Sequence, residues 1–151
     1  MNPYLILKYF HILLAIVAVG FNATYGVWLA RAAQEPKHML HVLRGIQTLD
    51  NVFANPAYAL LLITGLGMLI VGGIALTTFW IVVALILYGL AIVVGIVLFA
   101  PVLRRQVALL ESGAGQTPEF RQLARRSTIL GIVTMVDVLL IIVMMVFKPT
   151  L

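Results

Sequence analysis

Apolar residues along the chain fall into four long runs, which are separated by short polar segments. A helix needs about 20 predominantly apolar residues to cross a bilayer, and each run is about that long. The sequence therefore predicts an all-α fold, a four-helix transmembrane bundle that forms one integral membrane domain over residues 1–151. The predicted spans are residues 4–29, 54–74, 79–100 and 127–147.

The connections between the runs contain residues that end helices. The segment GGIALTT follows the second run, and the Gly and Pro of ESGAGQTPEF separate the third run from the fourth. Upstream of the second run, HMLHVLRGIQTLDNVF also has the pattern of a helix. We therefore expect one long helix over about residues 37–73, kinked at Pro56, because proline removes a backbone hydrogen bond and clashes with the preceding turn. The first run is long and contains the polar Asn22 and Tyr25. Both features favour a retained span over a cleaved signal peptide.

Polar and small residues within the runs recur at steps of three and four, so each set lies on one helix face. Such faces allow close packing of helices in lipid. We expect them to meet at the centre, either as a packing surface or as the lining of a cofactor, substrate or proton site. The four sets are Tyr4, Lys8, His11, Ala15, Ala18, Asn22 and Tyr25; Asn51, Asn55, Tyr58, Leu62 and Gly65; Ala84, Tyr88, Ala91 and Gly95; and Arg126, Leu130, Thr134, Asp137, Ile141 and Met144.

Asp137 is the only formal charge between Arg126 and Lys148. Measured from the span midpoints, it lies near the bilayer midplane, at the depth of Tyr88 and Thr64. Ionisable residues at such depth are candidates for function, although a structural polar clasp is the alternative. We predict that Asp137 faces the interior and hydrogen-bonds Tyr88, His11 or a water between them. The predicted intramembrane polar site consists of Lys8, His11, Asn22, Tyr88 and Asp137.

Composition and charge support a membrane location. The mean hydropathy is +1.12, and charged residues make up 10% of the chain, against about 25% in soluble domains. The net charge of +5 comes from basic residues that flank the apolar runs, which favours anionic lipid over nucleic acid as the partner. Eight of the ten Lys and Arg residues lie in the first and third connections. The positive-inside rule then places both connections in the cytoplasm and both termini outside.

Candidate ligand residues are few. The chain has no cysteine, which excludes thiolate metal sites and thiol catalysis. His38 and His41 share a helix face at a spacing that suits Zn²⁺ or Cu²⁺, but we interpret them as interfacial residues and predict no metal site. A haem needs one or two axial ligands, and His11 is the one histidine within a span that could supply one.

Several stretches resemble a known family: LKYFHILLAIVAVG, NPAYALLLITG, RRSTILG and MMVFKP. Because of these stretches, the chain as a whole resembles small bacterial four-helix proteins known only as integral membrane proteins of unknown function. This resemblance implies a bacterial inner-membrane location and no particular activity. Lys8 and His11, followed by Gly20, are also similar to the start of copper-resistance D and HemJ-type membrane proteins, as Pro56 is to the latter. That similarity would make Lys8 and His11 site residues. The chain departs from it in lacking a tryptophan before Gly20.

We therefore expect a small non-enzymatic membrane protein with an accessory or transport-related role. One alternative is a haem- or porphyrin-linked redox protein that uses His11. The other is a proton-coupled small transporter that uses Asp137, working as an oligomer because four short helices enclose little space. The expected partners are the lipid bilayer and a further copy of the chain or another membrane protein, and not nucleic acid.

Overall fold

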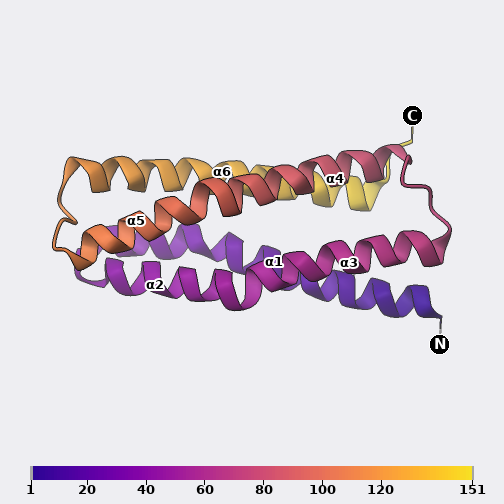
Figure 1. Cartoon of the computed structure of the whole chain (residues 1–151), viewed down its shortest axis with the longest axis horizontal. Helices are drawn as coiled ribbons and strands as arrows, with labels where there is room; N and C mark the ends of the chain where they lie inside the picture. The colour runs from indigo at the N-terminus through magenta and orange to yellow at the C-terminus, as the bar shows by residue number, and fades with distance from the viewer. Residues whose placement is uncertain (1, 151) are drawn as a thin grey trace.

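The computed structural model describes residues 2–150 and shows a bundle of four long helices (Figure 1). No strand occurs within that range. Each of the four helices is long and apolar enough to cross a membrane. The predicted all-α four-helix transmembrane bundle is therefore confirmed. The helices are Pro3–Gln34, Pro36–Gly72, Phe79–Glu111 and Pro118–Phe147.

The first helix, α1 (Pro3–Gln34), is longer than the span predicted within it. Its 32 residues extend about 48 Å at about 1.5 Å per residue, whereas the hydrocarbon core of a bilayer is about 30 Å thick. The Asn2 side chain caps its start by accepting a hydrogen bond from the Tyr4 backbone N–H at 2.9 Å. The helix ends before Pro36, since a proline disfavours helical geometry in the residue that precedes it. Part of α1 therefore extends beyond the apolar core of a membrane.

The two ends of the bundle differ in what they contain. The start of α1, the end of α6 (Pro118–Phe147) and the turn between α3 (Asn55–Gly72) and α4 (Phe79–Ile92) lie together at one end, here the terminal end (Figure 1). The connections after α1 and before α6 lie at the opposite end, here the basic end. At the terminal end α3 stops because Gly73 adopts a φ of +63°, which lets the Ile74 N–H donate to the Leu69 carbonyl at 2.9 Å.

The second long helix is interrupted by a wide turn. It begins with a 3₁₀ turn, η1 (Pro36–His38), and continues as α2 (Met39–Leu49), the π-helical turn η2 (Asp50–Ala54) and then α3. Proline has no N–H and its ring clashes with the carbonyl four residues back, so a wider turn just ahead of Pro56 accommodates it. The ribbon changes direction there (Figure 1). The predicted long helix with a break at Pro56 is therefore present, and the break takes the form of a π turn.

The third long helix repeats this arrangement. It consists of α4, the π-helical segment η3 (Val93–Phe99) and α5 (Ala100–Glu111), with Pro101 directly after the wide segment. The helix thus continues past the predicted span, to a turn in which Gly113 has a φ of +76°. The next helix then starts at a Thr117 side chain that accepts from the Phe120 N–H at 3.3 Å.

The helices pack as two pairs. α1 lies along α3, and α4 lies along α6, while α1 also contacts α6. At the basic end α2 packs on α1 and α5, and α5 packs on α6. No close backbone contact joins α3 to α4 or α6 within residues 2–150. The half of the bundle toward the terminal end is therefore built from two pairs, whereas the basic end has a shared core.

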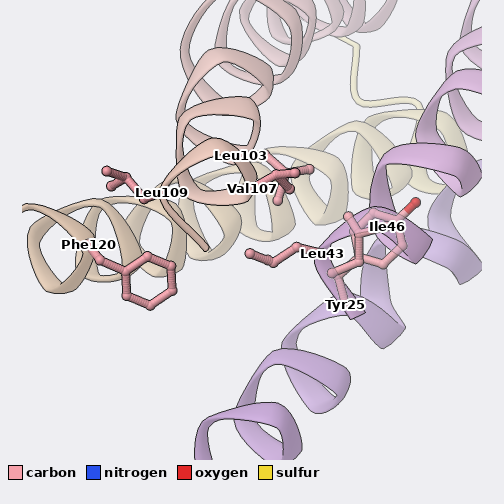
Figure 2. Packing of buried hydrophobic residues seen from close by; sticks show 7 residues of the cluster. All are labelled: Tyr25, Leu43, Ile46, Leu103, Val107, Leu109 and Phe120. Carbon is pink, nitrogen blue, oxygen red and sulfur yellow. The ribbon is translucent and has the colours of Figure 1, made fainter. Parts of the chain in front are cut away.

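That shared core contains the large buried apolar side chains (Figure 2). Leu43 of α2 and Leu103 of α5 are the largest fully buried ones. Elsewhere in the bundle the buried positions include several alanines, which allow helix backbones to approach closely. The core cluster consists of Tyr25, Leu43, Ile46, Leu103, Val107, Leu109 and Phe120. The buried alanines outside it include Ala18, Ala54, Ala57 and Ala84.

Candidate functional site

Asp137 lies in α6 and points into the bundle. Its side chain is enclosed, with 4% of the residue exposed, and the next residue, Val138, is buried too, whereas Val136 and Leu139 are exposed. Neither carboxylate oxygen has a hydrogen-bond partner among the described residues. An ionised carboxylate buried without partners destabilises a protein by several kcal/mol. Asp137 therefore occupies a position where a proton or another ligand would complete an otherwise unsatisfied group.

Tyr88 of α4 and Tyr58 of α3 link the two helix pairs. The Tyr88 hydroxyl donates to the Tyr58 backbone carbonyl at 2.8 Å. The Tyr58 hydroxyl in turn accepts from the Asn22 side-chain amide at 2.8 Å, and that amide also donates to the Ala18 carbonyl at 2.9 Å. A phenol has one proton to donate, and that of Tyr88 is used by Tyr58. The predicted hydrogen bond between Tyr88 and Asp137 is therefore wrong.

His11 of α1 lies against α3. Its Nδ1 is 2.9 Å from the Thr64 Oγ1. Because the Thr64 hydroxyl donates to the Leu60 carbonyl at 2.8 Å, its oxygen is left to accept from an Nδ1–H of His11. Gly65 makes the approach of the ring feasible, since a Cβ at that position would stand 3.2 Å from the His11 Cε1. The predicted direct hydrogen bond between His11 and Asp137 is also wrong, because neither Asp137 oxygen has a partner among the described residues. The alternative, in which a water joins them, stays a prediction.

Four residues of the predicted polar faces lie outside the interior. Lys8, which the sequence places in the site, is exposed, and so are Asn51, Asn55 and Arg126. Lys8 lies toward the terminal end, where α1 packs mainly on α3, and its long side chain can extend away from the apolar surface. The two asparagines were placed by regular helical steps. Asn51 lies within the π turn, whose extra residue shifts it off the face that regular steps predict. Asn55 begins the regular helix α3, so its exposure does not follow from the π turn.

Asp50 is the inward-facing residue that sequence reasoning missed. It is the first residue of the π turn, and its Oδ1 accepts a hydrogen bond from the Tyr25 hydroxyl at 2.8 Å. Tyr25 is 5% exposed, whereas Asp50 is only partly buried. Asp50 and Asp137 are the only two aspartates of the chain.

The three glutamates have a different environment. They lie at the basic end on exposed positions, and each has a basic partner. The Glu111 carboxylate is 2.7 Å from Arg44, that of Glu119 is 2.8 Å from Arg105, and that of Glu35 is 3.4 Å from His38. No lysine or arginine forms such a pair with either aspartate in the part of the chain that the structure describes. The two aspartates are therefore set apart from the glutamates by both burial and partners.

Two further polar features lie at the basic end. His38 and His41 are both exposed, and no group of three or more His, Cys, Asp or Glu side chains within residues 2–150 is arranged to hold a metal ion. Gln106 of α5 is 2% exposed, and its Oε1 has no hydrogen-bond partner among the described residues.

Comparison with known proteins assigns a family. Residues 5–149 match the profile of a family described as "Predicted integral membrane protein (DUF2269)". Because the match covers nearly the whole chain, the protein belongs to that family, and its membrane location and four apolar helices agree with that description. No curated protein and no solved structure matches the chain.

Proposed function

We propose that this member of the integral membrane protein family is a non-enzymatic, transport-related protein of the bacterial cytoplasmic membrane, in which Asp137 binds and releases a proton. The main support for this proposal is that both Asp137 oxygens are buried without a hydrogen-bond partner among the described residues. Within membranes, such residues are typical of proton relays and of proton-coupled transporters. Stability alone gives little reason to keep one.

A proton fits the site better than a metal cation. Ca²⁺ and Mg²⁺ bind through several oxygen ligands, whereas Asp137 offers two oxygens with no second carboxylate beside it. The Tyr88 proton is used by the Tyr58 carbonyl, and neither Asp137 oxygen has a hydrogen-bond partner among the described residues. A proton needs only one oxygen, and it removes the charge that makes the buried site unfavourable.

The same proposal includes an orientation and a partner. All eight lysines and arginines of the first and third connections are exposed at the basic end, so by the positive-inside rule that end faces the cytoplasm. Reporter fusions after Gln34 and after Gly115 should then read cytoplasmic, and a fusion at Leu151 should read external. A cytoplasmic signal at Leu151 would contradict this orientation.

We also propose that the protein forms a homo-oligomer, because four helices alone enclose too little space for a solute. Native mass spectrometry in detergent would detect the oligomer as a multiple of the chain mass.

Proton movement through the purified protein tests the function. Liposomes containing the protein and a trapped pH indicator would be given a membrane potential with potassium and valinomycin. Proton entry should be faster than in empty liposomes, and the excess should disappear in Asp137→Asn, which keeps the size and polarity of the side chain but cannot exchange a proton. A wild-type rate equal to that of Asp137→Asn would exclude the proposed function.

A haem- or porphyrin-linked redox function is the rival expectation, and it depends on His11. The Nδ1 of its ring contacts Thr64, and its Cε1 packs where Gly65 leaves room, so Nε2 is the one nitrogen left to bind iron. The other two histidines are exposed at the basic end. The purified protein could show an absorption band of bound haem that His11→Ala lacks. That result would favour the redox function over proton transport.

A further inference from the structure

An open groove runs along the outer side of α1, on the part of the helix toward the basic end. It extends from Ile16 to Trp28, and Leu49 at the end of α2 also lines it. Its lowest point is Gly20, where an added Cβ would meet no atom within 4 Å. Ile16 and Trp28 are both exposed. The groove is therefore accessible from outside the bundle, where the lipid of a membrane lies.

The length and depth of this groove match one leaflet of a bilayer. The rise from Ile16 to Trp28 is about 18 Å at about 1.5 Å per residue, and half of the hydrocarbon core is about 15 Å thick. Ile16 lies at the middle of the apolar run 4–29, and Trp28 lies near its end. Tryptophan favours the level of the headgroups. The groove thus extends from that level to about the midplane, as an acyl chain does.

A basic side chain continues the line of the groove. Arg31 follows Thr24 by seven residues and Trp28 by three, so on a regular helix it lies on the same face as both. Arg31 is exposed, and it forms no salt bridge among the described residues. Glu35, the acidic residue nearest to it in the sequence, pairs with His38 at 3.4 Å instead. Arg31 is therefore left to meet an anion at the headgroup level.

We propose that this groove binds a phospholipid with an anionic headgroup. One acyl chain lies along α1 over Gly20, and Arg31 holds the phosphate, since a guanidinium presents a fork of donors that matches phosphate oxygens. A zwitterionic headgroup carries its own cation beside the phosphate, so it gains less from Arg31. The proposal does not depend on proton binding by Asp137, which lies inside the bundle.

Two other occupants would fit an open apolar groove. The first is any bilayer lipid, which would pass over α1 without regard to its headgroup. The second is a helix of another copy of the chain, because small residues such as Gly20 also allow close packing of helices. The unpaired Arg31 at the headgroup level favours the anionic lipid over both. The experiments must therefore separate a headgroup preference from general lipid contact and from self-association.

Fluorescence of Trp28 tests the headgroup preference. The chain has two tryptophans, so Trp80→Phe leaves Trp28 alone, and it would be placed in phosphatidylcholine vesicles that contain a quenching brominated lipid. Brominated phosphatidylglycerol should occupy the site about fivefold better than brominated phosphatidylcholine, as expected for one basic residue near anionic lipid. Arg31→Gln should bring the two lipids close to equal, whereas Arg104→Gln, an exposed arginine at the same end of the bundle, should keep the preference.

Two results of this assay would overturn the proposal. Equal quenching of Trp28 by the two lipids in the protein with Arg31 would mean that the groove holds bilayer lipid of any kind. An equal loss of preference in Arg31→Gln and Arg104→Gln would mean that anionic lipid is attracted by the basic end as a whole.

A matched pair of glycine variants tests the position of the lipid. Gly20 and Gly26 both lie on α1 with no atom within 4 Å of an added Cβ, but only Gly20 lines the groove. In native mass spectrometry with added phosphatidylglycerol, Gly26→Leu should retain one lipid per chain like the wild type, and Gly20→Leu should retain severalfold less. Equal retention by both variants would place the lipid elsewhere. Loss of an oligomer instead of the lipid in Gly20→Leu would assign the groove to a second copy, and either result would overturn the proposal.

Discussion

The two halves of the bundle use acidic residues in opposite ways. At the basic end the glutamates are exposed and paired, as in Glu111 with Arg44 at 2.7 Å, and the core beneath them is made of large side chains such as Leu43 and Leu103. Deeper in the bundle, Asp50 and Asp137 have no basic partner, and many of the buried neighbours are alanines.

This difference separates residues that hold the fold from residues that are free for chemistry. Exposed ion pairs contribute about 0–1 kcal/mol each, so the basic end owes its stability mainly to packed apolar side chains. The polar interior contributes little, since hydrogen bonds between transmembrane helices average about 0.6 kcal/mol. Asp137, which has no protein partner, contributes least of all. We therefore expect the free energy of unfolding to depend mainly on the basic end, and proton binding to depend on the interior.

Truncating the core should have the largest effect. Leu43 is completely buried, and Leu43→Ala should lower the free energy of unfolding by about 2–5 kcal/mol through the lost contacts and the cavity left behind. The matched control is Leu90→Ala, at a position that is 45% exposed and faces lipid. Unfolding of both variants in mixed micelles would be measured by circular dichroism. Similar losses for the two would argue against a dominant core at the basic end.

Removing the Asp137 carboxylate should raise the free energy of unfolding rather than lower it. Asp137→Leu eliminates a buried polar group that has no protein partner, and it should raise the free energy of unfolding by about 1–3 kcal/mol. Asp137→Asn should change stability much less, because it leaves a polar group of the same size. The same micelle titration measures both. Marked destabilisation by Asp137→Leu would show that the carboxyl is a structural clasp.

A smaller effect should distinguish two glycines. Gly20→Ala adds a methyl group to a position with no atom within 4 Å, so it should stabilise the helix by about 0.5–1 kcal/mol. In Gly65→Ala the new Cβ would stand 3.2 Å from the His11 Cε1, so the ring must move and its contact with Thr64 weakens. That variant should lack the gain and shift the His11 ring ¹⁵N resonances. An equal gain at both positions, with unchanged resonances, would contradict the close packing of α1 on α3.

The surface ion pair should matter least. Arg44 and Glu111 have side chains that are 59% and 46% exposed, and a double-mutant cycle with Arg44→Gln and Glu111→Gln should give a coupling of about 0.2–1 kcal/mol. The coupling should shrink as salt is added, because exposed charges are screened. A coupling that is larger and independent of salt would mean that the basic end is held together by its charges.

Much of the fold follows from the sequence, since apolar run lengths fix the four helices and Pro56 marks the break in the second. The site was harder to predict because regular three- and four-residue steps fail across a π turn. They placed Asn51 inward, whereas the structure exposes it and turns Asp50 toward Tyr25. The depth of Tyr88 along its span predicted that it lies near Asp137. Depth alone does not determine the hydrogen-bond acceptor, and the Tyr88 hydroxyl donates to the Tyr58 carbonyl instead. A proline four to six residues after an acidic residue within a helix is a signal that could have suggested Asp50.

The most direct test of the central claim is an infrared titration of Asp137 itself. The chain has only two aspartates, so in Asp50→Asn labelled with ¹³C-aspartate the remaining side-chain carboxyl signal belongs to Asp137. We expect this signal to change reversibly between the acid and carboxylate bands as pH is varied over the range in which the protein stays folded. We also expect the acid band to shift in D₂O and to be absent from Asp137→Asn. A signal that stays in one form throughout that range, with no exchange in D₂O, would contradict the claim that Asp137 binds and releases a proton.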